Sequence, residues 1–568
     1  MSKFVIYQVI PRLFTNYNPS PVPNGTIEQN GCGKLNAITP KALKSIKSFG
    51  ATHVWYTGIL EHATQTDYSR FGIRPDNPNI VKGRAGSPYA IKDFYDIDPD
   101  LAEDVPHRMK EFEALVERTH AAGLKVIIDC VPNHVFRQYA SDSRPRGVRD
   151  FGEDDHSEWA FSPLNNFYYI PNETFRPNFD IGDYNEYPAK ATGNDVFSAH
   201  PTRNDWYETV KLNYGVFYQG GGEKQFTPVP DTWHKMREVV RFWAKKGVDA
   251  FRCDMAEMVP HEFWNWMIPA VKFEFPGVEF IAEVYNPLLY RTYLNAGFDY
   301  LYDKVGLYDT LRNILSRGHN ASELTHCWQS VQDISGQMLN FLENHDEQRL
   351  ASGFYCGNGK YAEPAMIVAA TLSKAPVMIY MGQELGELGM DCEGFSGIDG
   401  RTSIYDYWSV SSLRAWANNG KFDGRGLTAE QQQLRDFYSR LMHIALKEKA
   451  IAEGRMFDLQ YAQNHNRYNA ARQFAFFRQY APSASAAFLR KQQLVLVVVN
   501  FDDQPADISL HVPEEALQFL GIPDGTAFNA ENLLGNCPVP DSVTLSPDND
   551  ITLNLPPWRG VILRLKPA

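Results

Sequence analysis

The sequence lacks the features that mark membrane proteins, disulfide-rich secreted proteins and nucleic-acid-binding proteins. No apolar run is long enough to cross a bilayer, and no charged leader with an apolar core precedes the first strand-like segment. The seven cysteines are scattered, odd in number and never in a CxxC pair, so we expect reduced, buried thiols. The formal net charge of −13 disfavours nucleic acid and anionic membrane as partners. We therefore expect a cytoplasmic protein, and the sequence leaves its oligomeric state open.

Strand-like and helix-like segments alternate through residues 1–450. The helix between the first two strands has clear ends, because Thr39 suits the N-cap, Pro40 the first turn and Gly50 the position after the last turn. A helix between two apolar strands favours parallel pairing. Eight strands with intervening helices predict a (β/α)8 barrel. The predicted strands are Phe4–Ile10, Ala51–Tyr56, Leu124–Asp129, Asp249–Asp254, Glu279–Glu283, Tyr300–Lys304, Met338–Glu343 and Val377–Tyr380.

Two segments break this alternation and predict further domains. Residues 136–228 are rich in Pro, Asn, Asp and aromatics, and they are too many for a structureless loop, so they predict a domain inserted after strand three. Beyond residue 451, short strands separated by Asp, Pro and Gly predict a C-terminal antiparallel β-sandwich over 451–568. The barrel itself then comprises residues 1–135 and 229–450.

Charged residues stand at the ends of several predicted strands, which is where an α/β barrel places its chemistry. Arg252 and Asp254 lie two residues apart, and so on one face of their strand, where the guanidinium can keep the carboxylate ionised. An isolated Arg–Asp pair is more often a structural ion pair. Here Glu283 and Asp346 end two further strands at the same mouth of the barrel, and this convergence favours an active site.

The surroundings expected for Asp254 and Glu283 suit the cleavage of an acetal. That reaction needs one carboxylate as nucleophile and a second, protonated carboxyl group that acts first as acid and then as base. Apolar neighbours such as Ile281, together with nearby anionic charges, favour the protonated form of Glu283, whereas Arg252 does the reverse for Asp254. We therefore expect Asp254 to be the nucleophile and Glu283 the proton donor.

Four segments, in order along the chain, resemble the four sequence regions of the α-amylase (glycoside hydrolase family 13) superfamily. These segments are Asp129–His134 (resembling DxVxNH), Phe251–Asp254 (xRxD), Ala282–Tyr285 (xExW) and Phe341–Asp346 (FxxNHD). The resemblance implies a TIM barrel with the insertion as domain B and the sandwich as domain C.

The resemblance also implies a role for each matching residue. Asp254 becomes the nucleophile of a covalent glucosyl intermediate, Glu283 the acid/base, and Asp346 the third carboxylate, which grips sugar hydroxyls in the transition state. Asp129 is expected to support the site. The chemistry requires no cofactor. The residues expected to bind substrate are Tyr89, His134, Arg252 and His345.

This chain departs from the family pattern at two places, and a third position bears on calcium. Glu257 and Met258 stand where many starch-degrading amylases have a Lys-His pair, so we predict short α-glucooligosaccharides or a modified glucoside, such as a phosphorylated one, as better substrates than starch. Glu257 either contacts the sugar or caps the helix near Pro260. Tyr285 replaces a frequent Trp. The position of Asn133 helps to bind a structural calcium in many amylases, and a calcium ion is left open here.

Three functions compete. The leading prediction is a retaining hydrolase or transglycosylase that acts on α-glucans or short α-glucooligosaccharides, with carbohydrate as its partner. The alternative is a non-catalytic carbohydrate-binding or interaction member of the same fold, although such relatives usually lack one of the three carboxylates. A third is an unrelated barrel enzyme that uses a metal, and no HxH or comparable ligand spacing supports it.

Overall fold

A computed structural model describes residues 3–463, 467–481 and 492–568. Eight parallel strands form one sheet in the order β15-β14-β13-β12-β5-β2-β1-β16, and a parallel bridge between Asn340 and Val377 closes it. The predicted (β/α)8 barrel is therefore confirmed. Its strands are β1 (Val5–Val9), β2 (His53–Tyr56), β5 (Lys125–Cys130), β12 (Ala250–Cys253), β13 (Glu279–Ala282), β14 (Tyr300–Tyr302), β15 (Met338–Leu339) and β16 (Val377–Tyr380).

The seventh strand is shorter than predicted. After Leu339 the chain leaves the regular ladder, and the side chain of Asn340 donates to the carbonyl of Ala369 at 3.0 Å. The residues from Phe341 onward therefore form the loop that carries the third carboxylate rather than the end of a strand.

Helices surround the barrel and end where local sequence dictates. The side chain of Thr39 accepts a hydrogen bond from the backbone N–H of Ala42, and Gly50 closes the helix with φ of 115°. The helices outside the C-terminal domain are α1 (Pro11–Phe14), α2 (Ile27–Asn30), α3 (Pro40–Phe49), α4 (Arg108–Ala121), α5 (Asp231–Lys245), α6 (His261–Glu274), α7 (Tyr290–Asn295), α8 (Asp309–Arg317), α9 (Glu323–Ser330), α10 (Glu363–Thr371), α11 (Ser411–Ala417), α12 (Ala429–Lys447) and α13 (Lys449–Ala452). In the described part of the chain, none of the helices is long and apolar enough to cross a membrane.

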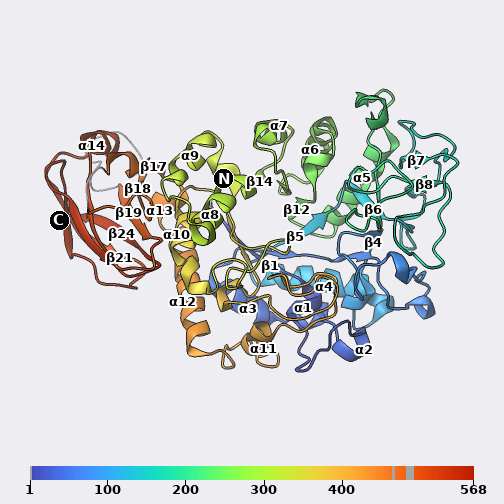
Figure 1. Ribbon diagram of the computed structural model, residues 1–568, viewed down its shortest axis with the longest axis horizontal. Helices are drawn as coiled ribbons and strands as arrows, with labels where there is room; N and C mark the ends of the chain where they lie inside the picture. The colour runs from blue at the N-terminus through green and yellow to red at the C-terminus, as the bar shows by residue number, and fades with distance from the viewer. Residues whose placement is uncertain (1–2, 464–466, 482–491) are drawn as a thin grey trace.

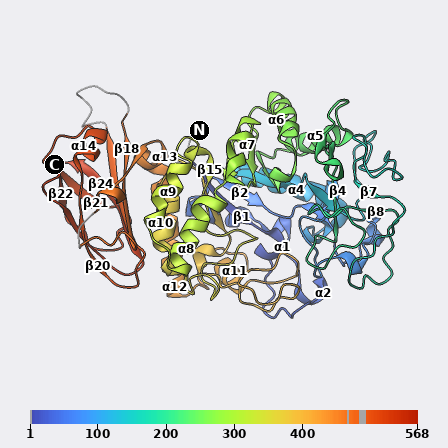
Figure 2. The same cartoon turned by 45° about the horizontal axis from the view of Figure 1, so that its top comes forward.

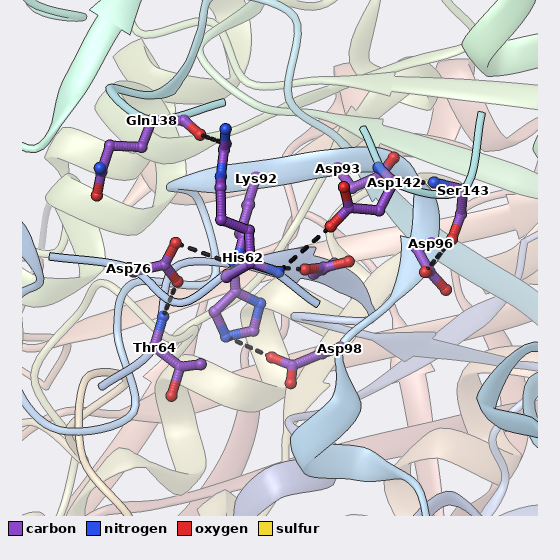
Figure 3. Close-up of polar contacts among 12 residues, drawn as sticks. His62, Thr64, Asp76, Lys92, Asp93, Asp96, Asp98, Gln138, Asp142 and Ser143 are labelled. Atoms are coloured by element: carbon purple, nitrogen blue, oxygen red, sulfur yellow. Dashed lines mark hydrogen bonds and ion pairs between the residues drawn. The ribbon is translucent and has the colours of Figure 1, made fainter. Parts of the chain in front are cut away.

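A buried polar network holds the hairpin of β3 (Leu60–His62) and β4 (Ile91–Ile97), which follows the second barrel strand. His62 Nε2 contacts Asp98 Oδ2 at 2.7 Å, and Lys92 Nζ lies 3.1 Å from Asp76 Oδ1 (Figure 3). Because buried charges are stable only when they are paired, this network fixes the loop that leads into β4 and carries Tyr89.

The insertion after β5 consists of short strands joined by loops. Its first strand, β6, pairs antiparallel with β9, so His134 lies opposite Lys211. The remaining short strands form the pairs β7–β8 and β10–β11. The strands are β6 (His134–Phe136), β7 (Tyr169–Ile170), β8 (Ala189–Lys190), β9 (Thr209–Lys211), β10 (Val216–Phe217) and β11 (Glu223–Lys224).

The C-terminal domain lies at the end of the long axis opposite β7 and β8 (Figures 1 and 2). Its antiparallel sheet has the order β17-β18-β19-β24-β21-β22, and β20 pairs with β23, as the predicted all-β domain requires. The elements are β17 (Arg455–Asp458), β18 (Gln473–Tyr480), β19 (Gln493–Asn500), β20 (Ala506–Leu510), α14 (Glu514–Leu520), β21 (Thr526–Asn532), β22 (Ser542–Leu545), β23 (Ile551–Leu555) and β24 (Arg559–Pro567).

Strand β19 is apolar on both faces because both faces are buried. Val495, Val497 and Val499 belong to the barrel's hydrophobic core, whereas Leu496 and Val498 belong to the core of the C-terminal domain. The alternation of side chains along a strand thus joins the two domains through one element.

The cysteines are free, as expected, but they are not uniformly buried. Cys130, Cys253 and Cys327 are buried, whereas Cys392 is exposed in the loop after β16. The prediction of buried thiols is therefore wrong for Cys392, because composition does not tell which loop turns toward solvent.

Candidate active site

The three expected carboxylates meet at one cavity of about 330 Å³ at the carboxyl ends of the barrel strands. Asp254 follows β12, Glu283 follows β13, and Asp346 lies in the loop after β15. Tyr89 and His134 line the same cavity. The positions predicted from four separate segments are thus brought together in space.

The guanidinium group of Arg252 connects these carboxylates. Its Nη1 lies 2.6 Å from Asp254 Oδ1 and 3.4 Å from Asp129 Oδ1, and its Nη2 lies 2.8 Å from Glu283 Oε2. The expected contact of Arg252 with Asp254 is present, and the contacts with Asp129 and Glu283 are additional to it. Strands β12 and β13 are neighbours with Cys253 opposite Ala282, so one planar fork of donors reaches the residues after both strands.

Burial, rather than the arginine, dominates the proton affinity of Asp254. Removal from water raises the pKa of this carboxyl well above its usual value, the charge of Arg252 opposes the rise, and Glu283 and Asp129 add to it. Burial also raises the pKa of Asp129 to about 6. The expectation that Arg252 would give Asp254 the opposite environment to Glu283 is therefore wrong, because the carboxylates share one buried site.

Glu283 accepts hydrogen bonds from the end of the neighbouring strand β12 and from the loop after its own strand, β13. The backbone N–H of Met255 donates to Oε2 at 2.8 Å, and Met255 has φ of 44°, a left-handed conformation. The phenol of Tyr285 donates to Oε1. The Tyr that replaces the family's frequent Trp therefore contacts the proposed acid/base directly.

Glu257 stabilises the loop that follows Glu283. Its Oε2 accepts from the backbone N–H groups of Tyr285 at 3.1 Å and Asn286 at 3.0 Å. The helix-cap interpretation of Glu257 is wrong, because α6 begins after Pro260 without a side-chain cap. Glu257 is thus a structural link between the segment after β12 and the loop after Glu283.

His345 and Tyr89 form a stacked pair beside the carboxylates. Their ring centroids are 5.1 Å apart, and the Tyr89 hydroxyl lies 2.5 Å from His345 Nε2. The amide Nε2 of Gln8 donates to Nδ1 of His345 at 2.8 Å, so we assign the ring proton of His345 to its other nitrogen. That nitrogen, His345 Nε2, also lies 3.2 Å from Asp346 Oδ2. Tyr89 in turn donates to Asp129 Oδ1 at 3.3 Å.

Both histidines are neutral at physiological pH. Burial lowers the pKa of His345 well below its usual value, and burial together with the charges of Lys211 and Lys82 lowers the pKa of His134 to about 3. Neutral imidazoles offer one donor and one acceptor each, which suits hydrogen bonding to hydroxyls. Asp346, whose side chain is 44% exposed, completes this side of the cavity.

Sequence reasoning missed several residues of the cavity wall. They come from loops and from the insertion, where no periodicity or motif marks them. Only half of them are aromatic or charged, and that character was the one available signal. The missed lining residues are Lys82, Ser87, Trp206, Glu208, Thr209, Met255, Ile404 and Tyr405.

The surroundings of Asn133 do not suit a calcium ion. Asn133 Oδ1 accepts from Lys211 Nζ at 2.7 Å, and the same ammonium lies 2.6 Å from Asp195 Oδ1. Lys211 is 2% exposed. A cationic side chain therefore already occupies the position between the two oxygen ligands that a divalent ion would need.

A second acidic group belongs to the β3–β4 hairpin itself, and Figure 3 labels two of its members, Asp93 and Asp96. Glu61, Asp93 and Asp96 each offer a buried carboxylate oxygen within 4.8 Å of the others. Lys92 Nζ lies 3.7 Å from Glu61, and Arg108 contacts Asp96. These two cations supply counter-charge to the group, as buried carboxylates require.

Residues 8–276 match the family model of the alpha amylase catalytic domain. Neopullulanase 2 of Thermoactinomyces vulgaris is 24% identical over 401 residues, which are 68% of this chain and 57% of the relative. An alpha-1,4-glucan:maltose-1-phosphate maltosyltransferase of Cereibacter sphaeroides is 30% identical over 220 residues, 37% of this chain and 26% of that protein. The chain thus spans less than two thirds of either relative.

Solved structures share the whole fold. A maltogenic alpha-amylase, AmyB, of Thermotoga neapolitana superposes with a TM-score of 0.63 at 18% identity, covering 100% of this chain and 99% of the other. An alpha-amylase of Geobacillus thermoleovorans, solved with acarbose, superposes with a TM-score of 0.62 at 17% identity, covering 99% of this chain and 98% of the other. The similarity to these structures extends through the insertion and the C-terminal domain.

Proposed function

We propose that this protein, whose residues 8–276 match the alpha-amylase catalytic-domain model, cleaves α-glucosidic bonds with retention of configuration. It acts on α-glucans or short α-glucooligosaccharides, as a hydrolase or a transglycosylase. The observation that carries the proposal is that Asp254 and Glu283 contact two nitrogens of the same guanidinium group. Retaining enzymes hold their carboxylates about 5 Å apart, whereas inverting enzymes leave about 6.5–9.5 Å for a water.

The reaction then proceeds by double displacement. Asp254 attacks the anomeric carbon while Glu283 gives its proton to the leaving oxygen, and a covalent glucosyl ester forms. Glu283 next takes a proton from a water or a sugar hydroxyl, which attacks the same carbon and releases Asp254. Arg252 stabilises the carboxylate that is regained, because its Nη1 donates to Asp254 Oδ1 at 2.6 Å.

The sugar is held by groups that neither gain nor lose a proton in the reaction. The neutral His134 and His345 bind hydroxyls, and Asp346 accepts hydrogen bonds that strengthen as the ring flattens toward the oxocarbenium-like transition state. Tyr89 offers its ring face to the sugar. These side chains come from three separate segments, with His345 and Asp346 adjacent in the loop after β15, and such a division is usual for a barrel enzyme.

The test uses the Glu283→Ala variant with α-glucosyl fluoride and azide. Fluoride leaves without protonation, so Asp254 still forms the intermediate, and azide then attacks it to give β-glucosyl azide. The Asp254→Asn variant is the matched control and yields no such product. An α-configured azide, or no rescue in a folded Glu283→Ala protein, would contradict the proposed roles.

Product analysis distinguishes hydrolysis from transfer. The wild-type protein is incubated with maltose, maltotriose, sucrose, trehalose and soluble starch, and released sugar is compared with transfer products. Absence of cleavage of every α-glucoside would overturn the proposed function.

A further inference from the structure

A charged pair that the double displacement does not use forms part of the cavity wall. Lys82 lies in the loop before β4, and Glu208 lies immediately before β9 of the insertion. Lys82 Nζ is 2.8 Å from Glu208 Oε1, and the two side chains are only 13% and 5% exposed. The pair therefore connects the barrel to the insertion beside the proposed catalytic residues.

One oxygen of this pair has no partner. In the described part of the chain, Glu208 Oε2 is buried and accepts no hydrogen bond. Buried carboxylate oxygens in native proteins are normally hydrogen-bonded, so an exception beside an active-site cavity calls for a ligand. A hydroxyl group is the simplest donor that could enter a cavity of this size.

The neighbours of the pair place it on the side of His134. The Trp206 ring lies 5.2 Å from the ring of His134, in an edge-to-face arrangement. Lys82 Nζ lies 5.3 Å from the centre of the Tyr207 ring. The loop that carries Lys82 is fixed against the opposite wall, since the backbone N–H of Ala85 donates to the carbonyl of Tyr405 at 3.0 Å.

We propose that Lys82 and Glu208 bind hydroxyl groups of a neutral glucosyl unit next to His134 and thereby determine substrate specificity. Glu208 Oε2 accepts from one hydroxyl, and the ammonium of Lys82 donates to a neighbouring one. This assignment rests on the proposed function. The pair selects unmodified sugars over phosphorylated ones. The carboxylates of Glu208, Asp254 and Asp346 line the cavity, and their charges repel a phosphate more than Lys82 attracts it.

The experiment combines substitutions with deoxy substrates. We expect Glu208→Gln and Lys82→Met each to lower kcat/KM for maltotriose by about 10- to 100-fold. A series of monodeoxy maltosides, each lacking one hydroxyl, identifies the hydroxyl bound. For one analogue, we expect the wild-type kcat/KM to be about tenfold or more below that for the parent maltoside. With Glu208→Gln the same analogue and the parent maltoside should have equal kcat/KM, because the contact is already absent.

Glu262→Gln is the matched control, since Glu262 pairs with Lys224 away from the cavity, and it should retain wild-type kcat/KM. Lys82→Met keeps the test valid if Glu208→Gln fails to fold. The proposal is overturned if the two variants match the wild type, or if no deoxy maltoside couples to Glu208.

Binding measurements separate this proposal from the proposed function. Calorimetry with maltose is performed on Asp254→Asn and on Asp254→Asn/Glu208→Gln, where turnover plays no part. Weaker binding by the double variant supports the role of Glu208 even if the wild type shows no glycosidase activity. Equal binding by both proteins contradicts it. Maltose 6′-phosphate should bind the Asp254→Asn protein more weakly than maltose, and tighter binding would also overturn the proposal.

Discussion

The lysine between Asn133 and Asp195 predicts that this protein needs no calcium for stability. Replacing Lys211 by Met keeps much of the side-chain volume but leaves Asn133 Oδ1 buried and unpaired, which costs about 1–3 kcal/mol. The lost ion pair with Asp195 adds little, because that carboxylate is 38% exposed and surface pairs contribute up to about 1 kcal/mol. We therefore expect Lys211→Met to lower the free energy of unfolding by about 2 kcal/mol.

The assay is unfolding in urea, with EDTA or with excess calcium. We expect the urea concentration at the midpoint of wild-type unfolding to be the same in EDTA and in calcium. The Lys211→Met midpoint should fall by the same amount in EDTA and in calcium, because the methionine side chain still fills the space between the two oxygens. Lys224→Met, which removes a more exposed ion pair, is the control and should change little. The reasoning is refuted if EDTA destabilises the wild type and Asn133→Leu abolishes that effect.

Three further predictions concern the active site, pH and substrate size. Asp254→Asn should retain its fold but lose several powers of ten in turnover, and substantial activity in the pure variant would contradict the nucleophile assignment. Burial raises the pKa of Asp303 to about 6, so its contribution to stability is full below the unfolded value near 3.8 and is lost as pH rises through 6. The free energy of unfolding of Asp303→Asn, measured in urea, should therefore increase relative to that of the wild type by up to about 3 kcal/mol between pH 4 and pH 8. The same difference between variant and wild type at both pH values would disprove this. Maltotriose should exceed amylose in kcat/KM per chain end, and a clear preference for internal cleavage of the polymer would show the opposite.

The residues that could be predicted from sequence are those whose position follows from strand ends. Asp254 and Glu283 terminate apolar runs, and parallel strands end at one mouth, so their convergence needed no structure. The partners of Arg252 depend on the register between β12 and β13, which hydrophobic pattern does not set. This is why its contact with Glu283 was not expected.

The remaining cavity residues lie where sequence carries little structural information. Trp206 and Glu208 belong to an insertion built of short strands and loops, and Lys82 belongs to a loop whose path depends on a distant carbonyl, that of Tyr405. The two hydrogen bonds of Glu257 likewise involve backbone groups of another segment. Contacts of this kind are set by tertiary structure, so composition and spacing alone could not reveal them.

The two-sided burial of β19 has a consequence for how this chain can be shortened. All nine residues of α10 are buried, and the barrel-facing valines of β19 belong to the same hydrophobic core as the apolar residues of this helix. A fragment ending near residue 450 would therefore expose the apolar surface of α10 to water, and one ending at residue 276 would also lack four barrel strands, β13 to β16. Such fragments should aggregate on expression, because the smallest autonomous folding unit here extends from the first barrel strand to the last strand of the C-terminal sheet.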